Sequence, residues 1–151
     1  MSTVASGRQD AYIYDAVRTP FAKIGGALSG HRPDDLAALV VRSMVERAEG
    51  LDPESIDEVV FGNANGAGEE NRNVARMATL LAGLPTSLPG TTVNRLCGSS
   101  LDAAMMASRQ IEVDEAVVGA GVTVATVPGG VGDGGVERVH GASLARSGTA
   151  S

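Results

Sequence analysis

The chain has 151 residues, of which 43% are apolar, and this is enough for one domain with a hydrophobic core. Its 12 basic and 18 acidic residues give a formal net charge of −6, and Lys23 is its only lysine. This charge argues against nucleic-acid and anionic-membrane partners, which require clustered lysines and arginines. No apolar run reaches the length of a transmembrane span either.

The single cysteine, Cys97, cannot form an internal disulfide, so the chain fits a reducing compartment. Residues 1–10 are polar and contain no apolar stretch of signal-peptide length. We therefore expect a cytoplasmic protein in which residues 1–10 form a disordered leader. The sequence predicts no metal site.

Strand and helix signals alternate after the leader. A β-rich run over residues 11–17 ends before Pro20, and a glycine-containing loop follows over residues 21–32. Pro33 suits the first turn of a helix that ends at Gly50. Apolar residues at helical spacing predict one buried face for this helix: Leu36, Leu39, Val40, Met44 and Val45.

The same alternation continues toward the cysteine. We predict a second strand over residues 56–61, a polar loop over residues 63–71, and a second helix that ends near Gly83. A third strand over residues 91–95 leads to Cys97 and its helix, and residues 115–121 predict a fourth strand. This order is typical of a layered α/β domain. The second helix has apolar residues at helical spacing: Val74, Met77, Ala78, Leu80 and Leu81.

Cys97 lies between a short extended segment and a helix of small and apolar residues. A thiol at a helix N-terminus is close to unpaired backbone N–H groups and to the positive end of the helix dipole. Both favour the thiolate, the form that attacks carbonyl carbons. Only Asp102 and Ser108 interrupt the apolar surface of this helix, so we expect it to be buried on all sides. Without further context, a lone cysteine is more often an ordinary buried residue.

Residues 93–99 (VNRLCGS) resemble the active-site motif of the thiolases, whose cysteine takes the acyl group of a coenzyme A thioester. The resemblance runs from residue 12 to residue 121 and implies an α/β fold. That fold is the incomplete N-terminal half of a thiolase-like layered α/β/α domain with a mixed sheet. Four further stretches resemble the family in the same order, and the last two are most similar to degradative thiolases of the 3-oxoadipyl-CoA and 3-ketoacyl-CoA type: residues 15–21, 57–62, 68–77 and 82–85.

The resemblance makes Cys97 the acyl-accepting nucleophile, and its backbone N–H a donor to the thioester oxygen as charge builds there. The family takes its base from a histidine of a later domain and its acid from a second cysteine, and neither has a counterpart here. His31 is more simply a solvated loop residue, and His140 lies in a divergent tail. The resemblance further implies an acyl-CoA partner, coenzyme A as substrate rather than as a bound cofactor, and a homo-oligomer in the full-length family.

Five polar positions have both a structural and a functional interpretation. Ser100 stands where the family usually has glycine, and it either tunes the pocket or is a tolerated small residue. Asn94 either acts beside the nucleophile or binds backbone. Arg72, Asn73 and Arg76 either contribute to a subunit contact or form a solvated helix face.

Residues 122–151 form a glycine-rich, divergent tail after a partial thiolase N-terminal domain over residues 11–121. Nine of the 33 residues from 119 onward are glycine, and residues 122–127 are the only strand candidate there. We interpret the tail as the product of a shifted reading frame with early termination, and a divergent loop is the alternative.

Thiolases are more than twice as long and pair two similar halves, so we expect a fragment that is poorly stable and inactive alone. Its apolar surface would be exposed where the second half covers the helix after Cys97. Three functions remain open. They are a thiolase-type acyltransferase, which cleaves a 3-oxoacyl-CoA or runs the reverse condensation; a non-catalytic partner of an intact thiolase; and a condensing enzyme of the 3-ketoacyl synthase class, whose motif fits less well.

Overall fold

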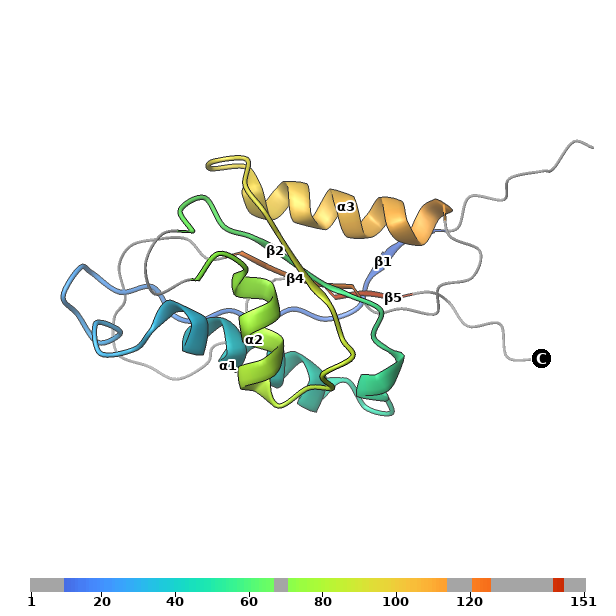
Figure 1. Cartoon of the computed structure of the whole chain (residues 1–151), viewed down its shortest axis with the longest axis horizontal. Helices are drawn as coiled ribbons and strands as arrows, with labels where there is room; N and C mark the ends of the chain where they lie inside the picture. The colour runs from blue at the N-terminus through green and yellow to red at the C-terminus, as the bar shows by residue number, and fades with distance from the viewer. Residues whose placement is uncertain (1–9, 67–70, 114–120, 126–142, 146–151) are drawn as a thin grey trace, which may run out of the picture.

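The computed structural model describes residues 10–66, 71–113, 121–125 and 143–145. These residues form a five-stranded sheet with helices on both faces (Figure 1). Helix α3 (Ser99–Val113) covers one face, while α1 (Pro33–Arg47) and α2 (Val74–Ala82) pack together on the other. The layered α/β/α fold expected from the sequence is confirmed.

The sheet is mixed, with the strand order β1-β5-β4-β2-β3. Strand β2 (Val59–Gly62) lies between β3 (Gly90–Val93) and β4 (Gly121–Ala125) and is parallel to both. Strand β5 (Ser143–Ala145) runs antiparallel to β4 and to β1 (Tyr12–Ile13). Because β2 and β3 are parallel and pair in register, their carboxyl ends lie together at one edge of the sheet.

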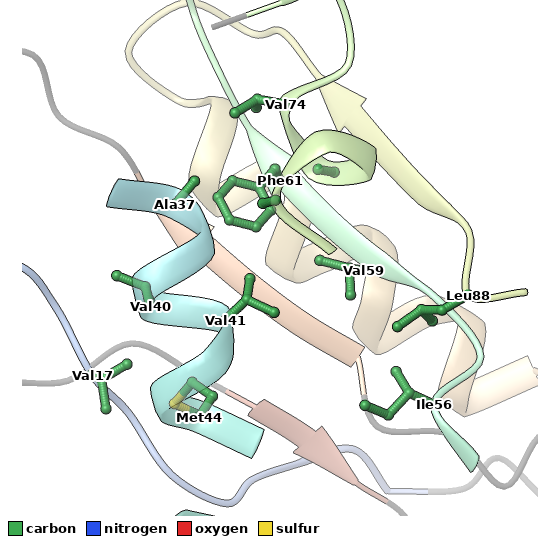
Figure 2. Close-up of a cluster of buried hydrophobic side chains, with 12 residues drawn as sticks. Val17, Ala37, Val40, Val41, Met44, Ile56, Val59, Phe61, Val74 and Leu88 are labelled. Carbon is green, nitrogen blue, oxygen red and sulfur yellow. The ribbon is translucent and has the colours of Figure 1, made fainter. Parts of the chain in front are cut away.

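The main hydrophobic core lies between the sheet and the α1–α2 layer (Figure 2). Side chains alternate between the two faces of a strand, so Val59 and Phe61 of β2 point into this core. Gly62 belongs to the alternate set and faces α3. The buried cluster consists of Val17, Ala37, Val40, Val41, Met44, Ile56, Val59, Phe61, Val74, Ala75, Ala78 and Leu88.

The predicted apolar faces of α1 and α2 are partly wrong. Leu39 of α1 and both Leu80 and Leu81 of α2 are about 40% exposed instead of buried. Four alanines are among the residues of the two helices that are buried instead. The buried residues of the two helices are Asp34, Ala37, Ala38, Val40, Val41, Met44, Val74, Ala75, Ala78 and Thr79.

The ends of α2 follow the sequence signals. The Asn73 side-chain oxygen accepts the backbone N–H of Arg76, which caps the first turn. Gly83 ends the helix with a left-handed φ of 80°, a conformation that glycine adopts without steric cost. Arg42 of α1 donates to the carbonyls of Leu81 and Ala82 at this end, so the two helices are also joined by polar contacts.

The observed strands are shorter than predicted, or shifted. The run over residues 11–17 forms only Tyr12–Ile13, the second strand starts at Val59 instead of residue 56, and the third occupies Gly90–Val93. A 3-10 turn over Pro53–Ser55 precedes β2, and Gly62 is the last residue of that strand.

The end of the chain is described only in short segments. Except for Gly121, the predicted strand over residues 115–121 lies outside the described residues. The same is true of the predicted leader over residues 1–10, apart from Asp10, and of most of residues 122–151. The candidate over residues 122–127 corresponds to β4, whereas β5 was not predicted.

The predicted burial of α3 on all sides is wrong. Only one stripe, spaced four residues apart, is buried against the sheet: Ser99, Ala103, Ala107 and Ile111. Elsewhere on the helix, Leu101 is 68% exposed and Val113 is 76% exposed. Arg109 and Gln110 are exposed on the same helix, so the exposed residues of α3 are both apolar and polar, and a surface for a second domain half stays a prediction. Within the described ranges, none of the helices combines the length and apolarity that crossing a membrane requires.

Candidate active site

The turn between β3 and α3 presents the thiol of Cys97. β3 ends at Val93, and Cys97 lies two residues before Ser99, the first residue of α3. Cys97 is exposed, and its thiol is free. The predicted position of the cysteine, where a strand hands over to a helix, is therefore confirmed.

Leu96, directly before the cysteine, has a left-handed backbone conformation with φ 47°. Non-glycine residues rarely adopt this conformation, which costs roughly 1–2 kcal/mol. The Leu96 side chain is 73% exposed, so its own packing does not offset that cost. The contacts of the neighbouring backbone must therefore hold the turn.

Ser99 supplies the shortest of these contacts. Its hydroxyl accepts the backbone N–H of Arg95 at 2.8 Å and donates to the carbonyl of Leu96 at 2.6 Å. The Ser99 backbone N–H also donates to the Leu96 carbonyl, at 3.1 Å, and the Gly98 N–H donates to the Arg95 carbonyl at 3.0 Å. The Ser99 residue is only 3% exposed. The turn that carries Cys97 is thus bonded to the first residue of a rigid helix.

Asn94 also holds this turn, and it connects the turn to the loop after β2. Its amide nitrogen donates to the carbonyl of Ala64, in the loop after β2, at 3.1 Å, and its oxygen accepts the Leu96 backbone N–H at 3.0 Å. The structure therefore bears out the interpretation in which Asn94 binds backbone. Both peptide groups of Leu96 are consequently held, one by Asn94 and the other by Ser99.

An ion pair also joins the turn to α3. The Arg95 Nε lies 3.1 Å from the Asp102 carboxylate, which is largely buried in the first turn of α3. A carboxylate in the first helical turn is stabilised by the helix dipole. The guanidinium is largely exposed, so solvent screens its attraction to Asp102.

The start of α3 lies directly on β2. A Cβ atom built on Gly62 would lie 2.2 Å from the Ser100 backbone nitrogen and 2.3 Å from the Ser99 carbonyl carbon. Beside this helix start only glycine fits at position 62, whereas Ser100 carries its side chain in a half-buried position. The sequence indicates Gly62 only as the end of a strand and assigns no role to Ser99, the last residue of the motif over residues 93–99.

Asn73 and Arg76 have roles within the chain. The Asn73 amide nitrogen donates to the Gly90 carbonyl, and the Arg76 guanidinium donates to the carbonyls of Leu88 and Thr86. These contacts tie α2 to β3 and to the loop before it. Arg72 is exposed, and a subunit contact through this region stays a prediction.

The structure does not bring His31 to the cysteine. His31 is exposed on the loop before α1 and lines a shallow groove with α1 and α2, on the opposite face of the sheet from α3. His140 lies outside the described residues. Within the described part of the chain, no group of three or more histidine, cysteine or acidic side chains is placed to hold a metal ion.

Comparisons with known proteins identify the family. The family model described as "Thiolase, N-terminal domain" matches residues 11–126. The beta-ketoadipyl-CoA thiolase of Escherichia coli is 59% identical over 107 residues, which cover 71% of this chain and 27% of that protein. The steroid 3-ketoacyl-CoA thiolase FadA6 of Mycobacterium tuberculosis is 43% identical over 102 residues, which cover 68% of this chain and 25% of that protein.

A solved structure shows the same fold. The acetyl-CoA acetyltransferase of Bacillus anthracis matches with a TM-score of 0.70 and 35% identity, over 79% of this chain and 29% of that chain. This chain therefore spans about a quarter of the length of the curated relatives it matches. Because the model of the thiolase N-terminal domain matches most of the chain, and because the chain is similar to these enzymes, it belongs to the thiolase family of acyltransferases.

Proposed function

We propose that the protein takes part in thiolase-type acyl transfer, in which Cys97 carries the acyl group as a thioester. One observation supports this most directly: the only thiol of the chain is exposed at the start of α3, on a turn whose backbone is held from both sides. A nucleophile held on a rigid element loses less entropy on reaching the transition state. The family assignment supplies the reaction class.

The reaction proceeds in two balanced steps. In the degradative direction the Cys97 sulfur attacks the keto carbon of a 3-oxoacyl-CoA, and the bond between its α and β carbons breaks. The electron pair and the thiol proton pass to the leaving fragment, which departs as acetyl-CoA. The thiol of a second coenzyme A then attacks the acyl carbon, and the Cys97 thiol is regenerated as the shortened acyl-CoA leaves.

Charge develops on the oxygen of the attacked carbonyl in both steps. The backbone N–H of Cys97 is our candidate donor to this oxygen, because it belongs to the turn that fixes the sulfur. Coenzyme A acts here as a substrate, and the proposal includes no permanently bound cofactor or metal. A 3-oxoacyl-CoA with a terminal carboxylate is the first substrate to test, since several relatives are named as beta-ketoadipyl-CoA thiolases.

The proton transfers need groups that the described residues do not place beside Cys97. His31 lies on the other face of the sheet, and general acid–base catalysis contributes factors of about 10² to 10⁴. We therefore expect the 151-residue chain alone to accept an acyl group slowly on Cys97 and not to complete thiolytic turnover. A homo-oligomer and a cytoplasmic location remain part of this proposal.

A second candidate function is that of a non-catalytic partner of an intact thiolase. Its binding surface would include the exposed Leu101 and Val113 of α3. The two candidates differ at the sulfur, since only the acyltransferase forms an acyl adduct.

The experiment is to incubate the chain with acetyl-CoA or a 3-oxoacyl-CoA and to map the adduct by mass spectrometry. Trypsin cleaves after Arg95 and Arg109, so residues 96–109 form one peptide that contains Cys97. We expect the acyl mass on this peptide, its absence in Cys97→Ser, and its retention in His31→Ala. A folded chain that iodoacetamide alkylates but no acyl-CoA acylates would contradict the proposal and favour the partner function.

A further inference from the structure

We propose that Ser99 is a positioning residue for Cys97: its buried hydroxyl holds the left-handed turn that presents the thiol. The inference deepens the proposed function and rests on it in so far as the positioned thiol is the acyl acceptor. Ser99 itself is assigned no contact with substrate.

The directions of its hydrogen bonds carry this inference. The Ser99 hydroxyl accepts from the N–H of Arg95 and donates to the carbonyl of Leu96, so it bonds to both backbone groups that flank the Arg95–Leu96 pair. A hydroxyl is the shortest side-chain group that can both accept and donate. Alanine at this position would keep the volume of the methylene and lose both bonds.

These bonds differ from those of a helix cap. A capping side chain accepts an N–H from the second or third residue of its own helix. The Ser99 hydroxyl instead bonds to two residues that precede the helix, so it fixes the turn relative to α3 and leaves the helix amides to other partners. Its effect should therefore appear at the thiol more than in the stability of the helix.

The Ser99 hydroxyl with its two hydrogen bonds, here called the clamp, is itself held rigidly. Ser99 is the first residue of the buried stripe of α3, and Gly62 of β2 leaves no room between the sheet and the backbone of residues 99 and 100. Leu96 needs such support because of its left-handed φ of 47°. Glycine at position 96 would adopt the same φ without steric cost and would make the clamp dispensable.

The test measures the rate constant for alkylation of Cys97 by iodoacetamide in the full chain, where Cys97 is the only thiol. We expect Ser99→Ala to lower this rate constant by about tenfold, because the sulfur is no longer held at the helix start. Ser108→Ala is the matched control. It removes another hydroxyl of α3, bonded to Glu112, and should leave the rate constant unchanged.

A double variant separates positioning from general damage. In Leu96→Gly/Ser99→Ala the turn keeps its shape without the clamp, so the rate constant should return to within about threefold of that of Leu96→Gly alone. Equal rate constants for Ser99→Ala and the unaltered chain would overturn the inference. So would an equal loss in Ser108→Ala, or a double variant as slow as Ser99→Ala.

Ser99→Ala should fold, because Arg95 and Leu96 are exposed and water can replace the lost bonds. Hydrogen exchange of the unaltered chain provides a second test, which applies even if the variant unfolds. The Arg95 amide proton should exchange at least about tenfold more slowly than in an unfolded chain, and exchange at the unfolded rate would contradict the clamp.

The two proposals fail in different ways. If no acyl-CoA acylates the unaltered chain but the alkylation rates follow the expected order, the acyl-transfer function fails and the positioning role stands. If acyl-CoA acylates the unaltered chain and Ser99→Ala equally fast, the positioning role fails and the function stands.

Discussion

Gly62 of β2 and Ser100 of α3 are in direct backbone contact, because a Cβ at position 62 would lie 2.2 Å from the Ser100 nitrogen. The start of α3 is thereby seated on the carboxyl end of a central strand. Since Cys97 precedes this helix by two residues, the position of the thiol depends on a glycine that is 35 residues earlier in the chain.

Gly62→Ala should therefore disturb both stability and the thiol. The methyl group would displace α3 from the sheet, and we expect the free energy of unfolding to fall by about 2 kcal/mol or more. Urea unfolding followed by circular dichroism measures this loss, and iodoacetamide alkylation measures the effect on Cys97. Gly30→Ala is the control, since a Cβ there meets no atom within 4 Å. If Gly62→Ala left the free energy of unfolding and the alkylation rate unchanged, the backbone contact would be refuted.

Leu96 should tolerate glycine better than a β-branched residue. With φ at 47°, we expect Leu96→Val to lower the free energy of unfolding by about 1 kcal/mol or more relative to Leu96→Gly. The same pair of substitutions at Leu101, which is also exposed but helical, should give the opposite order, because glycine is the poorer helix former. Identical rankings at the two positions would show that the left-handed turn is not present in solution.

Asn73 should matter for stability where Arg72 does not. Asn73→Ala removes the cap of α2 and the bonds to Gly90 and Thr92, so we expect a loss of about 1–2 kcal/mol in the free energy of unfolding. Arg72→Ala should change it by less than about 0.5 kcal/mol, as at other exposed positions. Comparable losses in the two variants would mean that the cap contributes nothing specific.

Asp34 should make stability fall in acid. Two hydrogen bonds from the Arg32 guanidinium lower the pKa of this carboxyl below its ordinary value of 3.8, against the opposing effect of burial. A carboxyl with a lowered folded-state pKa contributes stability that is present above pH 3.8 and is lost as the pH falls through the folded-state pKa.

The matching variant is Asp34→Asn, compared with Asp35→Asn in the same helical turn. At pH 7 we expect Asp34→Asn to lower the free energy of unfolding by only about 1 kcal/mol, because the Arg32 guanidinium is half exposed and solvent screens its attraction to Asp34. The difference from the unaltered chain should shrink below pH 3.8, where the carboxyl is protonated. A difference that stays constant from pH 7 to pH 2.5 would exclude the ion pair as its cause.

Local signals in the sequence located the helices well and the buried faces less well. Pro33 and Gly83 mark a helix start and a helix end in both sequence and structure, since their backbone preferences act locally. The exposure of Leu39 and Leu81 was not predictable from periodicity, because it depends on which helix packs against which face. The exposure of Leu101 has the same origin, since hydrophobicity alone does not say which surface the chain itself covers.

At the candidate site, the sequence identified the cysteine and its place before a helix, but not the residues that hold the turn. The sequence allows two interpretations of Asn94, because its bond to Ala64 joins loops 30 residues apart, which no local pattern reveals. The φ of Leu96 also has no signal in the sequence, because leucine is an unusual residue for that conformation.

The most direct test compares acylation of Cys97 in the folded chain with acylation of the same cysteine when nothing positions it. A synthetic peptide of residues 91–105 contains the motif without the sheet, and both would be exposed to the same acyl-CoA at the same pH. We expect the folded chain to be acylated at least about tenfold faster, because its thiol is held at the start of α3. Equal rate constants for the folded chain and the peptide would contradict the account.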